Sequence, residues 1–128
     1  LAPALAERAG VQVWGIGEKP GYSAPGVRYH AYGAPRGAGE QTHRYIRSLE
    51  ACLRRGQHLA NFLVNLRDKE ELRPDVIVCH PGWGEGLFLK DVFPRAKTLY
   101  YWEFYYHAFG QDLGFDPAQQ VSLDDAAR

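Results

Sequence analysis

The stretch DVIVCHPGWGEGLFLKDVFP, running from Asp75 to Pro94, decides the fold. Val76 to Cys79 form a continuous apolar run, which is typical of a strand covered on both faces, as in parallel sheets. A histidine ends this run, and Gly82 and Gly84 bracket a tryptophan. We expect the apolar residues that follow to form a short helix from about Glu85 to Val92. The stretch therefore predicts a strand, a tight turn and a helix in succession.

The rest of the chain alternates helices and strands around this unit. Steps of three and four between apolar residues predict one long amphipathic helix, with Gly56 on its buried side as a close-packing point. The other predicted elements are a helix at 1–9, strands at 11–17, 27–32 and 97–104, and this long helix at 41–69. The resulting order, α-β-β-α-β-α-β, is typical of the doubly wound α/β class.

The predicted fold is therefore α/β, a Rossmann-like three-layer domain with a mainly parallel sheet that comprises residues 1–128. The chain contains no methionine and opens inside a helix pattern, so we expect that residue 1 is a cut. A first strand, the middle of a 3-2-1-4-5 order, would then be missing, and segment exchange within a homo-oligomer is one way to replace it. Ser122 resembles a helix N-cap, so we expect the C-terminus to be a cut as well.

Composition excludes few function classes. With 45% hydrophobic residues and a net charge of zero, the chain suits a globular domain and does not indicate a nucleic-acid surface or an anionic-membrane surface. Peripheral membrane contact is possible but not indicated. No apolar run is long enough to span a membrane and no signal peptide opens the chain, so we expect a cytoplasmic protein. Cys52 and Cys79 are expected to be reduced thiols, with one disulfide as the alternative.

Ligands of open parallel sheets bind beyond the carboxyl ends of the strands. In this chain the three relevant strand ends are residues 15–17, 80–85 and 103–107, and we expect their polar residues to converge on one crevice. His80 would either act as hydrogen-bonding group or base, or cap the sheet. Gly82 and Gly84 allow a positive φ and a close backbone approach, so the next helix could offer N–H groups to a ligand oxygen. The alternative is a tight strand-to-helix turn that needs glycine for its backbone geometry alone. Glu85 would either stabilise the dipole of that helix or hold sugar hydroxyls.

Glu103 is a stronger catalytic candidate than His80 or Glu85, because a carboxylate among aromatic residues must form an ion pair or hydrogen bond, or else have a raised pKa. Some of the neighbouring aromatic residues could stack on a sugar, and alternation assigns at least half to the core: Tyr100, Tyr101, Trp102, Tyr105 and Tyr106. A metal site of His80, His107, Glu103 and Asp112 has only weak support, since no metal-binding motif is present. We expect no metal.

The blocks HPGWGE, LFLKDVFP, EFYY and DLGFDP, in this order, resemble the N-terminal domain of bacterial family 4 (group 1) glycosyltransferases of the GT-B fold. The resemblance implies a retaining, metal-independent enzyme without a cofactor. Its N-terminal domain binds the glycan or lipid-linked acceptor, and a C-terminal domain, absent from this chain, binds the nucleotide-sugar donor. The fragment alone should then be inactive.

By this resemblance His80 and Glu103 are the expected catalytic residues. The expected acceptor-binding residues are Gly82, Trp83, Gly84, Glu85, Tyr105 and Tyr106. A non-catalytic Rossmann-like domain that binds a carbohydrate or a partner is the alternative function. A nicotinamide-dependent domain is a third hypothesis, which the lack of a dinucleotide fingerprint disfavours.

Overall fold

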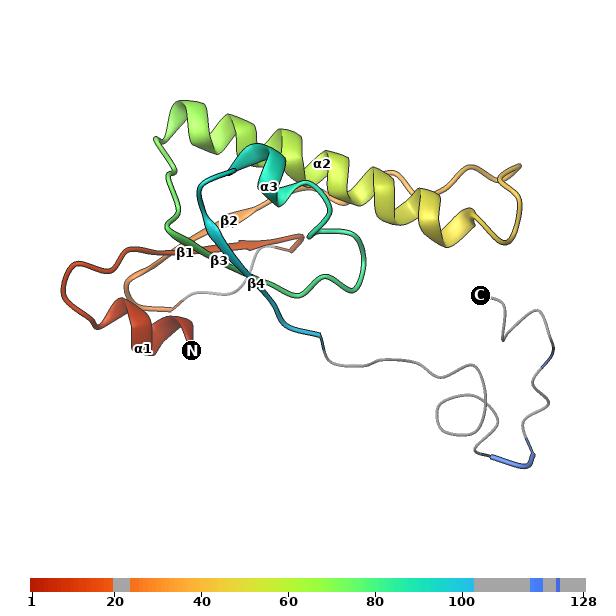
Figure 1. Cartoon of the computed structure of the whole chain (residues 1–128), viewed down its shortest axis with the longest axis horizontal. Coiled ribbons are helices and arrows are strands. Elements are labelled where there is room, and N and C mark those ends of the chain that lie inside the picture. Colours follow the sequence, from red (N-terminus) through yellow and green to blue (C-terminus); the bar gives the residue numbers. More distant parts are fainter. Residues whose placement is uncertain (20–23, 103–115, 119–121, 123–128) are drawn as a thin grey trace. The chain divides into compact units, whose positions relative to one another are not determined.

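The structure is a computed structural model that describes residues 1–19, 24–102, 116–118 and 122 (Figure 1). The elements follow the predicted order: α1 (Ala2–Ala6), β1 (Val13–Gly17), β2 (Val27–Ala31), α2 (Arg47–Lys69), β3 (Val76–Cys79), α3 (Leu89–Val92) and β4 (Lys97–Tyr100). The chain divides into two compact units, Leu1–Pro35 and Arg36–Arg128. In the described residues, no helix is both long and apolar enough to cross a membrane.

All four strands belong to parallel pairs. β1 pairs with β2, with Val13 opposite Val27, and β3 pairs with β4, with Val76 opposite Lys97. The parallel α/β class is thus confirmed, although the strands form two separate two-stranded sheets within the described residues.

In the first unit, side chains from the two strands pack across the ladder. Trp14 and His30 stack with their ring centroids 5.1 Å apart, and the Arg28 guanidinium lies 5.4 Å from the indole centroid. On the other face the Tyr29 ring occupies the space that a Cβ at Gly15 would need, and its hydroxyl donates to the Lys19 carbonyl over 2.7 Å. The glycines of β1 therefore make room for an aromatic residue of β2.

In the second unit, the core is formed by the buried face of α2, by α3 and by the segments that flank β3 and β4. The buried apolar residues there are Leu59, Leu63, Leu66, Leu72, Leu89, Val92, Phe93 and Ala96. The prediction that β3 is covered on both faces is wrong for the described residues. Val76, Val78 and Leu99 are more than half exposed, whereas Ile77 and Cys79 on the opposite face are partly buried.

Helix α2 begins at Arg47 rather than at Gln41, because side chains hold the preceding residues in turns. The Thr42 hydroxyl donates to the Glu50 carboxylate, and Arg47 Nη2 lies 3.2 Å from the carbonyl oxygens of both Glu40 and Thr42. These bonds satisfy backbone and side-chain groups that a longer helix would otherwise use.

Helix α3 is also shorter than predicted and does not include Glu85. Turns occupy residues 82–88, where the Gly84 N–H donates to the Pro81 carbonyl and the Leu87 N–H to the Gly84 carbonyl. Lys90, within α3, donates from Nζ to the carbonyls of Pro94 and Ala96, which follow the helix, at 2.9 and 2.8 Å. The lysine thus closes the return of the chain into β4.

The closest approach between α2 and the residues after β3 is made by two glycines. A Cβ at Gly56 would lie 2.7 Å from the Gly84 carbonyl oxygen, and one at Gly84 would overlap the Cys52 carbonyl group. Gly84 has a φ of 104°, and Gly82 does not have a positive φ, so the expectation of left-handed geometry is confirmed only for Gly84. Gly56 is the close-packing point that the helix pattern predicts.

Both cysteines are free and partly buried in the structure. Burial, and secondarily the negative charge of Glu85, raise the pKa of the Cys79 thiol. The folded protein therefore disfavours the Cys79 thiolate.

Replacing Gly84 with alanine should destabilise the protein by at least about 2 kcal/mol, since the substitution adds both backbone strain and a steric overlap. Urea unfolding measures the effect. Gly37→Ala is the matched control, because no atom lies within 4 Å of its added Cβ, and this change should stay within about 0.5 kcal/mol. Equal stability of Gly84→Ala and the wild type would contradict the close contact.

The Cys79 thiol should react with iodoacetamide more slowly than a free cysteine, with a pH midpoint above the ordinary thiol range. Glu85→Gln should lower this midpoint only slightly, because burial is the larger cause of the shift. The rate is measured by mass spectrometry of the Cys79 peptide from pH 7 to 10, with urea-unfolded chain as the reference. A midpoint equal to that of the unfolded chain would show that the thiol is not shielded.

Candidate functional site

The carboxyl ends of β3 and β4 meet at one edge of their sheet. The Tyr101 N–H donates to the Cys79 carbonyl over 2.9 Å, which extends the ladder to the last residue of β3. His80 follows β3 directly, and Tyr101 and Trp102 follow β4, so residues from the two strand ends lie at the same edge. The predicted convergence concerns residues 15–17, 80–85 and 103–107. Residues 15–17 belong to the other unit, and residues 103–107 lie outside the described residues, so their convergence with residues 80–85 stays a prediction.

His80 and Trp83 form the aromatic part of this edge. Their rings stack with centroids 5.1 Å apart and an interplanar angle of 30°. The imidazole covers Gly82, because a Cβ at that position would lie 2.9 Å from His80 Cε1. The Trp83 side chain nevertheless remains 63% exposed, so a large apolar ring is presented to solvent beside an imidazole.

Glu85 is tied to α2. Its Oε1 lies 3.5 Å from Arg55 Nη1, and both side chains are largely buried, with 17% and 24% of their surface exposed. The alternative in which Glu85 stabilises a helix dipole is wrong, because Glu85 lies in turns before α3. The pair instead joins the turns after β3 to the long helix, so a carboxylate and a guanidinium lie among the residues that follow β3 and contact α2.

Arg55 is a residue that the sequence analysis missed. Its only local signal is its place beside Gly56, the predicted close-packing point of α2. A charged residue next to a helix contact is well placed to reach the element that packs there, but the identity of its partner depends on tertiary structure.

The aromatic residues at the end of β4 differ in their contacts: one packs against the turns after β3, and two are exposed to solvent. The Tyr100 hydroxyl donates to the Gly86 carbonyl over 3.0 Å, and its ring fills the space that a Cβ at Gly86 would need. Tyr101 and Trp102 are 63% and 69% exposed. Tyr100 thus holds the turns in position, while the other two rings are available to a ligand at the edge.

The strand-edge site is defined here by Arg55, His80, Trp83, Glu85, Tyr101 and Trp102. Glu103, Tyr105, Tyr106, His107 and Asp112 lie outside the described residues. No group of three or more potential metal ligands occurs in the part of the chain that the structure describes. The N–H groups of Gly84 and Leu87 donate to carbonyls within the turns.

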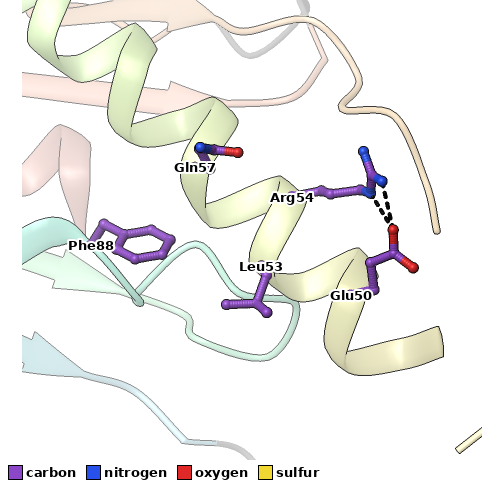
Figure 2. A pocket seen from close by; sticks show the side chains of 5 residues that line it. All are labelled: Glu50, Leu53, Arg54, Gln57 and Phe88. Atoms are coloured by element: carbon purple, nitrogen blue, oxygen red, sulfur yellow. Dashed lines mark hydrogen bonds and ion pairs between the residues drawn. The ribbon is translucent and has the colours of Figure 1, made fainter. Parts of the chain in front are cut away.

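A second concave surface adjoins the same turns. The α2 groove has a volume of about 400 Å³ and is lined by Glu50, Leu53, Arg54, Gln57 and Phe88. In Figure 2, Leu53 and Phe88 lie on one side, and the Glu50–Arg54 pair lies on the other. Arg54 Nε and Nη2 donate to the same Glu50 oxygen, at 2.8 and 2.6 Å. The sequence analysis did not predict this groove.

Comparisons with known proteins bear on what the strand-edge site does. Comparison with curated proteins gives no significant match, and comparison with solved structures gives none either. Residues 9–128 match a protein family described as the glycosyl transferase family 4 group. Since this match covers nearly the whole chain, the protein belongs to the glycosyl transferase family 4 group.

Proposed function

We propose that the chain is the acceptor-binding half of a retaining glycosyltransferase. The complete enzyme transfers a sugar from a nucleotide-sugar donor to a glycan or lipid-linked acceptor, and a second domain binds the donor. Family membership supports glycosyl transfer in general. The observation that carries the acceptor role is the pair of exposed tryptophans, Trp83 and Trp102, which follow neighbouring parallel strands.

The chemistry of this edge suits a carbohydrate. The C–H faces of a sugar ring are apolar, and its hydroxyl groups need hydrogen-bond partners. Trp83, Tyr101 and Trp102 offer exposed rings, while the His80 imidazole can donate or accept a hydrogen bond. Glu85 is held by Arg55, so its carboxylate position is fixed before a ligand arrives.

In the proposed reaction, an acceptor hydroxyl lies near His80 and Glu103 while the other domain presents the donor. Closure of the two domains excludes water and aligns the reactants. The hydroxyl oxygen forms a bond to the anomeric carbon as the bond to the nucleoside diphosphate breaks, and the hydroxyl proton passes to the leaving diphosphate. Glu103 orients the hydroxyl or stabilises the oxocarbenium-like charge that develops at this carbon. The mechanism requires no metal and no cofactor.

Trp83→Ala in the 128-residue chain should weaken glycan binding about tenfold, because it removes the exposed stacking surface. A glycan array identifies binding oligosaccharides, and isothermal titration calorimetry of the best of them measures the affinity. Trp83→Phe is the matched control, since it keeps an aromatic face and should retain most of the affinity. Unchanged affinity in Trp83→Ala would remove this residue from the acceptor site.

Glu103→Gln in the complete enzyme should reduce turnover at least tenfold, since it removes the carboxylate charge that the mechanism uses. His80→Ala should also reduce turnover. Both are measured by release of the nucleoside diphosphate under saturating donor. Glu71→Gln, an exposed position just after α2, is the matched control and should leave turnover unchanged. Near-normal activity of Glu103→Gln would exclude Glu103 from the mechanism.

A further inference from the structure

The α2 groove (Glu50, Leu53, Arg54, Gln57 and Phe88) lies against the same turns as the strand-edge site. A Cβ at Gly56 would lie 3.1 Å from the Phe88 ring and 3.2 Å from Leu87 Cβ, so α2 directly contacts these turns. Arg54 lines the groove, and its neighbour Arg55 pairs with Glu85 of the strand-edge site. One helix therefore contributes side chains to both places.

The lining of the groove combines apolar surface with a fixed polar group. Leu53 is 44% exposed, and the Phe88 ring is partly exposed beside it. Opposite them, Arg54 is held by two hydrogen bonds to Glu50, and Glu50 also accepts a hydrogen bond from the Thr42 hydroxyl (Figure 2). These bonds orient the guanidinium and leave its Nη1 group without a hydrogen bond to another described residue.

The charges and hydrogen-bonding groups that line the groove indicate which class of ligand it can bind. The Glu50 and Arg54 charges cancel, so the groove does not favour a strongly charged ligand. The Gln57 amide makes no hydrogen bond with another residue in the described ranges, and it offers both a donor and an acceptor. An aromatic face, a donor fork and an amide match the apolar faces and hydroxyl groups of a neutral sugar.

We propose that the α2 groove is a second carbohydrate subsite, which holds a neutral sugar unit of the acceptor next to the unit bound at the strand-edge site. Gln57 and Arg54 Nη1 bond to its hydroxyl groups, and Phe88 covers one face of its ring. Glu50 is a positioning residue that holds Arg54. This proposal rests on the proposed acceptor role, and it makes the preferred acceptor an oligosaccharide of at least two sugar units.

The test is ¹⁵N NMR of the 128-residue chain titrated with neutral oligosaccharides selected on a glycan array, and with the methyl glycosides of their single sugars. Oligosaccharides should shift the Gln57 side-chain amide and the backbone amides of residues 50–57, as well as those of 80–85. Single sugars should shift only residues 80–85 and 101–102. A response of residues 50–57 to single sugars alone, or to no sugar, would overturn the proposal.

Variants separate the two subsites. Gln57→Ala and Phe88→Leu should weaken oligosaccharide binding roughly three- to tenfold and leave single-sugar binding unchanged, as expected for loss of one hydrogen bond or one ring face. Asn61→Ala, an exposed amide one turn further along α2, is the matched control and should change neither. Equal losses for both ligand types would overturn the subsite.

The same titrations distinguish failure of the subsite from failure of the acceptor role. If Trp83→Ala weakens binding and Gln57→Ala does not, only the subsite is wrong. If neither variant affects any sugar, the acceptor role fails as well. Shifts of residues 50–57 caused by phosphocholine micelles but not by sugars would make the groove a lipid contact, and shifts caused by protein concentration alone would make it a contact between copies.

Discussion

The contact between Gly56 and Gly84 is the constraint on which the second unit depends. Neither residue has a side chain, so the backbone of α2 reaches the backbone of the turns after β3, and Gly84 fits only with its φ of 104°. This contact fixes the distance between the long helix and the turns. Arg55 can then reach Glu85, and Phe88 can lie beside Leu53. A larger residue at either glycine would move both surfaces together.

Helical geometry explains how α2 contributes to two surfaces. Successive residues of an α-helix are separated by about 100° around its axis, so Arg54 and Arg55 point in different directions. Arg54 is held within the helix by Glu50, one turn earlier, and Arg55 is held by Glu85 from the turns. Each guanidinium has a carboxylate partner before a ligand binds, which lowers the entropic cost of using it in recognition.

Local sequence signals predicted the order of all the elements, the exact extent of β3 and the close-packing role of Gly56, because periodicity and apolar runs are properties of neighbouring residues. They failed where distant groups compete with the backbone. The start of α2 depends on Thr42 and Arg47, and α3 is shortened by turns whose N–H groups bond to Pro81 and Gly84. The sequence likewise indicated His80 and Trp83, but it could not reveal ion-pair partners far apart in the chain, such as Arg55 and Glu85.

Two groups of exposed apolar residues in the second unit differ in where they lie relative to β3 and β4. Val76, Val78 and Leu99 are aliphatic and lie within β3 and β4, on the sheet face opposite Ile77 and Cys79. These residues lie within the paired strands, on one face of the sheet. The exposed rings of Trp83, Tyr101 and Trp102 instead follow the carboxyl ends of the strands, where open α/β sheets bind their ligands. Their ring faces support the strand edge, rather than the sheet face, as the proposed acceptor site.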